Sequence, residues 1–269
     1  MVRSTSRIVV WCVMLLMLGT TAPAEAQGTR HAVLIQGASG EEQYATQHRA
    51  WLDSLRSTLR ERFGYDAAAV TVLAEQPREG ELRATAEELR AVLARLAKSL
   101  APADQLLIVM IGHGTEQGQD ARFNLVGRDL NVEEWKALLA PIRATLAVVD
   151  TTSGSFPYLA GLAAPGRVII TATNSYAQQY HTVFPDAFVR ALTDPDADQD
   201  KNDRLSLLEA FSHAARLVRE YYEQKGIMAT ETPVIDDAGD GKGKLAAAEF
   251  SSSSPAALLY LDAPKVATS

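Results

Sequence analysis

Short apolar runs alternate along the chain with longer segments whose apolar residues recur at helical spacing. The short runs predict β-strands at His31 to Ile35, Val70 to Leu73, Gln105 to Ile111, Phe123 to Val126, Leu146 to Val149 and Val168 to Ala172. Helical spacing predicts a helix over Glu41 to Phe63, and the capping pairs Thr85/Glu88 and Asn131/Glu134 each predict a helix start. A further helix is expected from Leu207 to about Gln224, after an acidic segment. Strands separated by helices pair in parallel, and runs that are apolar throughout are buried on both faces. We therefore predict an α/β fold, a three-layer α/β/α sandwich with a mostly parallel central sheet.

The first 26 residues have a different pattern. Arg3 and Arg7 precede an unbroken apolar run from Ile8 to Leu18, and the small residues of Ala24-Glu25-Ala26 follow. This order is typical of a secretory signal peptide, and the run is too short to span a bilayer. We expect an exported protein, periplasmic or extracellular, with no membrane association after cleavage; the alternative is that the segment is retained as an uncleaved anchor. The domain organisation expected is a signal peptide at 1–26, one domain at 27–250 and a tail at 251–269.

Composition limits the chemistry of the processed chain. The sequence has 269 residues, 47% of them hydrophobic, with 26 Lys and Arg against 33 Asp and Glu. A net charge of -7 disfavours a nucleic-acid partner, because such proteins present a basic face to the phosphates. The single cysteine, Cys12, lies inside the predicted signal peptide. Processing would therefore remove the chain's only thiol, and with it any cysteine nucleophile.

Two loops follow predicted central strands, where functional groups of parallel sheets collect. His113 stands between Gly112 and Gly114 after the third strand, so its imidazole is expected to be accessible. The second loop, from Asp150 to Ser155, contains hydroxyl groups and a glycine directly after a buried strand. Such a turn can supply a nucleophile or backbone amides for an oxyanion.

Together these loops resemble those of the legumain and caspase clan of cysteine peptidases. In that clan one strand ends in a His-Gly pair that carries the general base, matched here by His113 and Gly114. A later strand ends in the nucleophilic cysteine and a Ser-Gly-Ser turn, matched by the segment Thr151 to Ser155, with Thr151 at the cysteine position. The resemblance also implies a caspase-like sheet and a substrate-facing segment that includes Asn174, Ser175 and Tyr176.

The departures from this clan bear on activity. A threonine hydroxyl is far less acidic than a thiol, and Thr151 is internal, so it has no α-amino group to act as its base. Legumains also have an asparagine beside the catalytic histidine, whereas no asparagine precedes Asn124. The sequence therefore favours a non-peptidolytic pseudopeptidase that acts as a binding or scaffold module, with a peptide or protein as its ligand. The alternative is a hydrolase that uses Thr151 or Ser153 with His113. The sequence does not define an oligomeric state.

An acidic segment at 194–209 fits the spacing of an EF-hand calcium loop. Loop positions 1, 3, 5, 7, 9 and 12 correspond to Asp198, Asp200, Asn202, Arg204 (through its carbonyl), Ser206 and Glu209. Oxygen donors without sulfur favour Ca²⁺. Asp203 replaces the usual glycine, but aspartate tolerates left-handed backbone angles. A calcium-sensing module is thus a third interpretation, and a solvated acidic turn that begins a helix is the alternative without metal.

Two further segments are less informative. Asp236, Asp237 and Asp240 form a second acidic cluster whose spacing fits no metal-binding template, so a plain turn is at least as good an interpretation. The tail opens with four serines, typical of a linker, and Ala256 to Leu261 is compatible with an edge strand.

Overall fold

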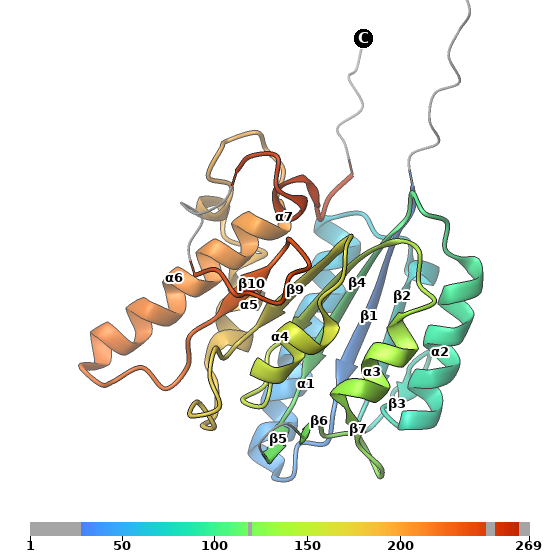
Figure 1. Cartoon of the computed structure of the whole chain (residues 1–269), viewed down its shortest axis with the longest axis horizontal. Coiled ribbons are helices and arrows are strands. Elements are labelled where there is room, and N and C mark those ends of the chain that lie inside the picture. Colours follow the sequence, from blue (N-terminus) through green and yellow to red (C-terminus); the bar gives the residue numbers. More distant parts are fainter. Residues whose placement is uncertain (1–27, 118–119, 246–250, 264–269) are drawn as a thin grey trace, which may run out of the picture.

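A computed structural model of the chain describes residues 28–117, 120–245 and 251–263. It contains a seven-stranded sheet in the order β10-β9-β8-β4-β1-β2-β3, in which every pair is parallel except β9 with β10 (Figure 1). The strands are β1 (Arg30–Gln36), β2 (Val70–Ala74), β3 (Leu82–Arg83), β4 (Gln105–Ile111), β8 (Thr145–Asp150), β9 (Arg167–Thr171) and β10 (Val234–Asp236). β4 lies at the centre, as its continuous apolar run predicts. The predicted signal peptide lies outside the described residues.

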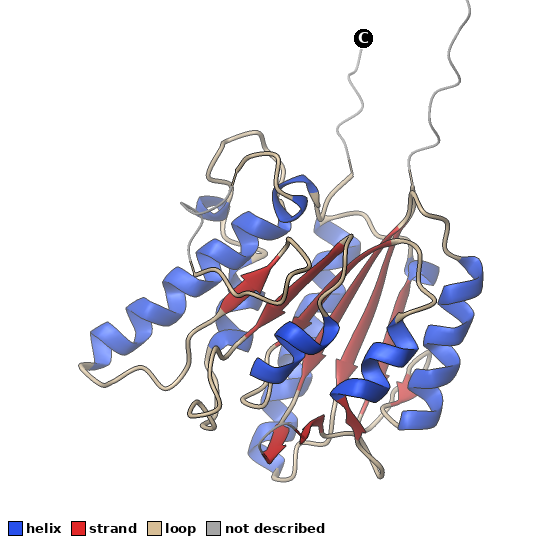
Figure 2. Cartoon of the chain, viewed as in Figure 1, coloured by secondary structure: helices blue, strands red, loops and turns tan. Residues whose placement is uncertain are grey.

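Helices cover both faces of this sheet, as Figure 2 shows. One face carries α1 (Glu42–Ser57), α5 (Phe184–Ala191), α6 (Leu207–Lys225) and α7 (Pro255–Leu258), and the other carries α2 (Ala86–Ser99), α3 (Val132–Leu139) and α4 (Phe156–Leu162). Alternate residues of each strand enter different cores. Leu107 and Val109 of β4 pack under the first set of helices, whereas Leu106 and Ile108 pack under the second. The three-layer α/β/α prediction is confirmed.

Local sequence signals account for the helix ends. Thr85 caps α2 by accepting a hydrogen bond from the Glu88 N–H at 3.3 Å. Asn131 and Glu134 form a reciprocal capping box at the start of α3, and Ser206 and Glu209 form another at the start of α6. α1 continues into a π-helical turn at Thr58–Arg62, and two short 3-10 turns occur at Ala67–Ala69 and Pro195–Ala197. None of the helices in the described ranges is long and apolar enough to cross a membrane.

Two strand predictions were displaced. The strand expected at Phe123 to Val126 is instead β6 (Asp120–Phe123), which pairs with β5 (Gly114–Gln117) and β7 (Leu130–Asn131) in a small antiparallel sheet. Leu125 is buried but belongs to no strand. An apolar residue can enter the core without pairing in a sheet. The edge strand expected at Ala256 to Leu261 is replaced by α7 and a single bridge between Tyr260 and Ser206.

Candidate functional site

The His113 loop leaves the carboxyl end of β4 and lies against the Thr151 to Ser155 turn that leaves β8. The two backbones touch at Gly114 and Gly154. A Cβ atom on Gly114 would lie 2.7 Å from the Thr152 hydroxyl and 2.8 Å from the Gly154 Cα. Glycine is therefore required for this approach, and it brings together two loops about forty residues apart in sequence.

The imidazole of His113 is held by the loop that follows β1. Its Nε2 lies 3.1 Å from the carbonyl oxygen of Ser39. Because a carbonyl oxygen can only accept, Nε2 carries a hydrogen, and Nδ1 is the ring nitrogen left to act as an acceptor. The edge of Tyr44 packs against the ring, with centroids 4.9 Å apart. His113 is partly exposed, and its ring is held in place by the Ser39 carbonyl and Tyr44.

Two further histidines surround His113. The buried His48 on α1 lies 5.1 Å from it between ring centroids, and its Nδ1 is 3.1 Å from the Ser39 hydroxyl. Burial, with a smaller contribution from the other two histidines, lowers the pKa of His48 to about 4. His181 lies 6.3 Å from His113, and burial followed by the charge of His113 lowers its pKa as well. Both rings are therefore neutral at neutral pH.

The hydroxyl group of Thr151 is directed into the fold. Thr151 is buried, and its Oγ1 donates at 2.8 Å to the carbonyl oxygen of Met110 in β4. Its own carbonyl accepts from the Thr182 hydroxyl at 2.7 Å. The side chain at the expected nucleophile position thus joins β4 and β8 and does not face the histidine loop with a free hydroxyl.

Thr152, rather than Thr151, faces the histidine loop at Gly114. Thr152 is 1% exposed, and its Oγ1 has no hydrogen-bond partner among the described residues. Its backbone N–H donates at 3.0 Å to Asp150, a fully buried carboxyl whose pKa is raised to about 7 by burial. Hydrogen bonding from the Thr152 N–H lowers that pKa by a smaller amount. Both threonine hydroxyls are therefore shielded from solvent.

The serines of the turn differ in their surroundings. Ser155 is buried, and its hydroxyl exchanges hydrogen bonds with Thr173 at the end of β9, consistent with a role in positioning the turn. Ser153 is partly exposed and lines a cavity of about 200 Å³ together with Gly114, Thr115, Glu116, Gly154 and Gln179. Among the hydroxyl groups of this turn, that of Ser153 is the one next to open space.

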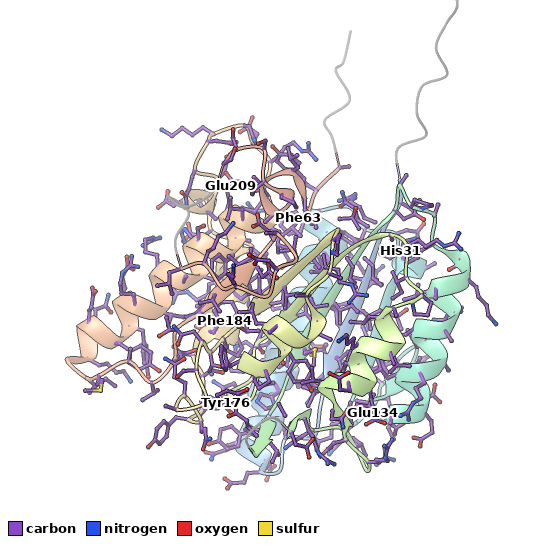
Figure 3. All side chains as sticks on the ribbon, in the orientation of Figure 1. His31, Phe63, Glu134, Tyr176, Phe184 and Glu209 are labelled. Carbon is purple, nitrogen blue, oxygen red and sulfur yellow. The ribbon has the colours of Figure 1, made fainter. Side chains whose placement is uncertain are left out.

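The expected substrate segment lies at the same end of the sheet, on the side of α4. Tyr176, labelled at the lower end of the molecule in Figure 3, is 44% exposed and packs edge-on against Phe156 at 5.0 Å. It lines a separate cavity of about 440 Å³ over α3 and α4. The Asn174 N–H donates to the Gln178 side chain at 2.9 Å, and Ser175 accepts a backbone hydrogen bond from Gln178. The segment is thus an ordered rim of the site.

The structure adds residues that sequence analysis did not select: Tyr44, His48, Glu116, Thr152 and His181. A signal existed for His48, because it precedes the apolar Trp51 by three residues and so lies on the buried face of α1. No comparable pattern marks Glu116 or His181. Their proximity to His113 results from the β5–β6 hairpin and the loop after β9.

The acidic segment lies at the opposite, amino-terminal end of the sheet, where Figure 3 labels Glu209. Single oxygen atoms of Asp198, Asp200 and Glu209 lie within 4.8 Å of one another. Asp203 adopts the left-handed conformation that glycine normally supplies, with φ of 60°, and Lys201 does so with φ of 57°. The bends therefore occur where an EF-hand loop needs them.

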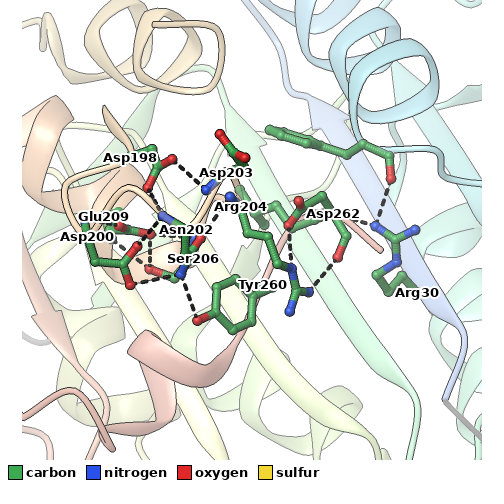
Figure 4. A network of polar contacts seen from close by, with 12 residues as sticks. Arg30, Asp198, Asp200, Asn202, Asp203, Arg204, Ser206, Glu209, Tyr260 and Asp262 are labelled. Carbon is green, nitrogen blue, oxygen red and sulfur yellow. Dashed lines mark hydrogen bonds and ion pairs between the residues drawn. The ribbon is translucent and has the colours of Figure 1, made fainter. Parts of the chain in front are cut away.

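Hydrogen bonds from backbone N–H groups and one hydroxyl order this loop (Figure 4). Glu209 accepts from the backbone N–H groups of Gln199, Asp200 and Ser206 and from the Ser206 hydroxyl. Asp198 accepts from the N–H groups of Asn202 and Asp203. In the described part of the chain, Asp198, Asp200 and Glu209 form no salt bridge with Lys or Arg. The loop thus gathers negative charge that the fold leaves unneutralised.

The remaining predicted oxygen donors surround the same loop. The Asn202 amide donates to Asp200 at 2.8 Å and to the Tyr260 hydroxyl at 3.2 Å. The Arg204 guanidinium stacks on the Tyr260 ring at 3.7 Å, so the side chain turns away from the carboxylates and leaves the carbonyl as its only ligand atom. The loop backbone also pairs with the C-terminal segment, through Leu261 N–H to Leu205 oxygen at 2.9 Å.

The second acidic cluster is a hydrogen-bonded turn. Asp236 is fully buried, and its carboxylate accepts the N–H groups of Ala238, Gly239 and Gly241 at 2.8 to 3.0 Å. Asp237 pairs with Lys244 at 3.2 Å. Among the described residues, this cluster does not bring three metal-ligand atoms close to one another.

Comparisons with known proteins bear on the fold. No family model matches the chain, and no curated protein matches it in sequence. Among solved structures, protein GSU0716 from Geobacter sulfurreducens aligns with a TM-score of 0.51 and 14% identity, over 77% of this chain and 92% of that one. Caspase-1 from Spodoptera frugiperda aligns with a TM-score of 0.47 and 12% identity, over 79% of this chain and 87% of that one. At these identities the likeness concerns the fold alone.

Proposed function

We propose that this chain is an exported, non-peptidolytic relative of the legumain and caspase clan that binds peptide segments at the His113 loop. The observation that carries the proposal is the contrast between an oriented base and buried hydroxyls. His113 Nε2 donates to Ser39, which leaves Nδ1 available, whereas the hydroxyls of Thr151 and Thr152 are both shielded. With no accessible hydroxyl at the position where the clan has its nucleophile, the base contributes little to acyl transfer.

The same features support binding. The site contains aromatic and imidazole rings, an ordered rim at Asn174 to Tyr176, and a cavity beside Ser153 with room for one side chain. Loops at the carboxyl ends of parallel strands are the usual location of ligand sites in this class of sheet. A peptide laid across these loops would contact the backbone of Gly114 and Gly154, and this contact does not depend on peptide-bond cleavage.

Binding without cleavage can be tested with a peptide library. We expect peptides enriched on the purified protein to be recovered intact by mass spectrometry after prolonged incubation. Ser153→Trp, which fills the cavity, should weaken their binding at least about tenfold, corresponding to 1.4 kcal/mol. Ala91→Trp adds the same ring to an exposed position of α2 and should leave binding unchanged. Peptides that bind Ser153→Trp as well as the parent protein would contradict the proposal.

Hydrolysis by Ser153 with His113 is the second candidate, because Ser153 lines the cavity next to Gly114. Cysteine substitution distinguishes the positions. We expect the thiol of Ser153→Cys to react with iodoacetamide in the native protein, and that of Thr151→Cys to react more slowly by a factor on the order of 100, since a buried thiol must wait for local opening. Peptide mapping separates these thiols from Cys12.

A hydroxyl-directed fluorophosphonate probe decides between the two candidates. The non-peptidolytic proposal expects no labelling of the native protein. Labelling of Ser153 that disappears in His113→Ala would establish the hydrolase instead. Labelling that is indifferent to His113 would indicate a reactive hydroxyl outside the proposed site.

Calcium binding at Asp198 to Glu209 is the proposed structural support of this module. Three carboxylates without a basic partner, held on a loop with left-handed bends at Lys201 and Asp203, support it. The carbonyl of Arg204 and the oxygens of Asn202 and Ser206 complete the proposed ligand set. The site is at the far end of the sheet from His113, so its proposed role is stabilisation of the α6 side of the fold.

A further inference from the structure

Glu116 is an acidic side chain beside the candidate site that forms no ion pair with any described residue. It belongs to β5, two residues after Gly114, and lines the cavity of about 200 Å³ that also borders Ser153. Both of its carboxylate oxygens are shielded from bulk solvent, and neither has a hydrogen-bond partner among the described residues. An unpaired buried polar group costs on the order of 1–3 kcal/mol, more when charged, so a cation that paired with these oxygens would remove such a cost.

The walls of the cavity supply no compensating positive charge. Its lining consists of Gly114, Thr115, Glu116, Ser153, Gly154 and Gln179. Among the described ion pairs, none includes Glu116. Burial raises the pKa of Glu116, and a weaker interaction with the Gln179 amide lowers it, so no cationic group offsets the effect of burial. The cavity therefore has one negative charge and room for a single side chain.

Gln179 is the neighbour that can yield to a ligand. It is an exposed residue in the loop after β9, and its amide donates at 3.0 Å to the Tyr176 carbonyl instead of forming a regular hydrogen bond with Glu116. This contact lies at the surface, so the side chain can turn outward without disturbing either core. A cation entering past Gln179 would reach the carboxylate beside the Gly114–Gly154 contact.

We propose that the cavity at Glu116 binds the cationic side chain of an arginine or lysine in the peptide ligand. The inference rests on the peptide-binding function proposed above and names its preferred ligand chemistry. A guanidinium or ammonium group would replace the missing partner of both carboxylate oxygens with charge-assisted hydrogen bonds. The peptide backbone would then cross the touching loops, with its basic side chain in the cavity.

The test uses two small probes of equal shape. Nα-acetyl-arginine amide and Nα-acetyl-citrulline amide differ in the positive charge of the side chain, and their binding can be followed by NMR at the backbone amides of Gly114 and Gly154. We expect saturable shifts with the arginine probe and binding at least about tenfold weaker with the citrulline probe. Equal affinity, or shifts confined to residues outside the cavity, would overturn the proposal.

Variants separate the charge of Glu116 from the net charge of the protein. Glu116→Gln should bind both probes equally weakly, whereas Glu87→Gln, an equivalent change at an exposed position of α2, should keep the preference for arginine. Retention of that preference in Glu116→Gln contradicts the inference. Should this variant fail to fold, the two-probe comparison on the unmodified protein still decides the matter.

The outcomes also distinguish this inference from the function on which it rests. Library peptides that bind regardless of charge, and are lost in Ser153→Trp, leave the peptide-binding proposal intact and overturn the role of Glu116. Peptides unaffected by Ser153→Trp overturn the proposed function itself, whatever the arginine probe does.

Discussion

Removing calcium is expected to lower the melting temperature of this protein by roughly 5–10 °C. A ligand at a hundred times its dissociation constant stabilises the folded state by about 2.7 kcal/mol. In a protein of this size each kcal/mol corresponds to about 2–4 °C. The effect should be large because the three carboxylates of the loop have no basic partner in the described chain, so calcium would relieve repulsion as well as add ligand bonds.

Two substitutions at Glu209 separate its structural role from metal binding. Glu209→Ala removes four hydrogen bonds, including those of the capping box that starts α6, and should cost roughly 2–4 kcal/mol even in EDTA. Glu209→Gln preserves the shape and part of the network, and should mainly abolish the response to calcium. Asp240→Asn, outside the loop, is the matched control and should leave that response unchanged.

The measurement is a melting curve with and without EDTA, supported by terbium luminescence. Tyr260 lies beside the loop, with its hydroxyl 3.2 Å from the Asn202 amide, so it is placed to sensitise a bound lanthanide. We expect luminescence that calcium displaces and that Glu209→Gln lacks. An identical melting midpoint in calcium and EDTA would leave a solvated acidic turn as the correct interpretation.

Replacing Glu231 by alanine is expected to destabilise the fold by about 3–5 kcal/mol. Its buried carboxylate accepts the N–H groups of Val183 and Phe184 at the start of α5, and the Tyr222 hydroxyl of α6 at 2.9 Å. Alanine leaves these donors unpaired, and each unpaired buried group costs about 1–3 kcal/mol. The change would also loosen the loop that carries His181 and Thr182.

The same residue should make stability depend on pH. Burial raises the pKa of Glu231 from 4.5 to about 7, against lowering by its hydrogen bonds. The folded state therefore holds this proton more tightly than the unfolded state. The resulting stabilisation is fully present below pH 4.5 and is lost as the pH rises through about 7. Asp150, whose pKa burial raises from 3.8 to about 7, acts in the same direction, whereas His48 opposes both because its pKa is lowered.

Denaturant unfolding between pH 4.5 and 8 tests this prediction. Glu231→Gln imitates the protonated carboxyl, so we expect it to remove part of the decline in stability toward high pH while costing less than Glu231→Ala. Glu87→Gln, at an exposed position of α2, should keep the parent profile. If Glu231→Gln has the same pH profile as the parent protein, the raised pKa is wrong.

The hydrophobic pattern predicted most of the secondary structure because those elements depend on local periodicity. The six apolar runs and the two capping pairs are contained in segments of a few residues, and five of the six runs became strands of the main sheet. Phe123 to Val126 failed because the pattern reports burial and not strand pairing. The order of the strands is absent from the pattern, since it depends on contacts between distant segments.

By itself, the sequence determined the fold class, the placement of the His113 and Thr151 loops at the carboxyl ends of strands, and the spacing of the acidic loop. Tertiary structure alone decided that Thr151 bonds to Met110, that Ser39 contacts His113 across 74 positions of sequence, and that Glu116 has no regular hydrogen bond among the described residues. The physical reason is that a residue's type fixes the chemistry it can perform. Whether that chemistry is exposed, paired or hidden depends on neighbours that only the folded chain supplies.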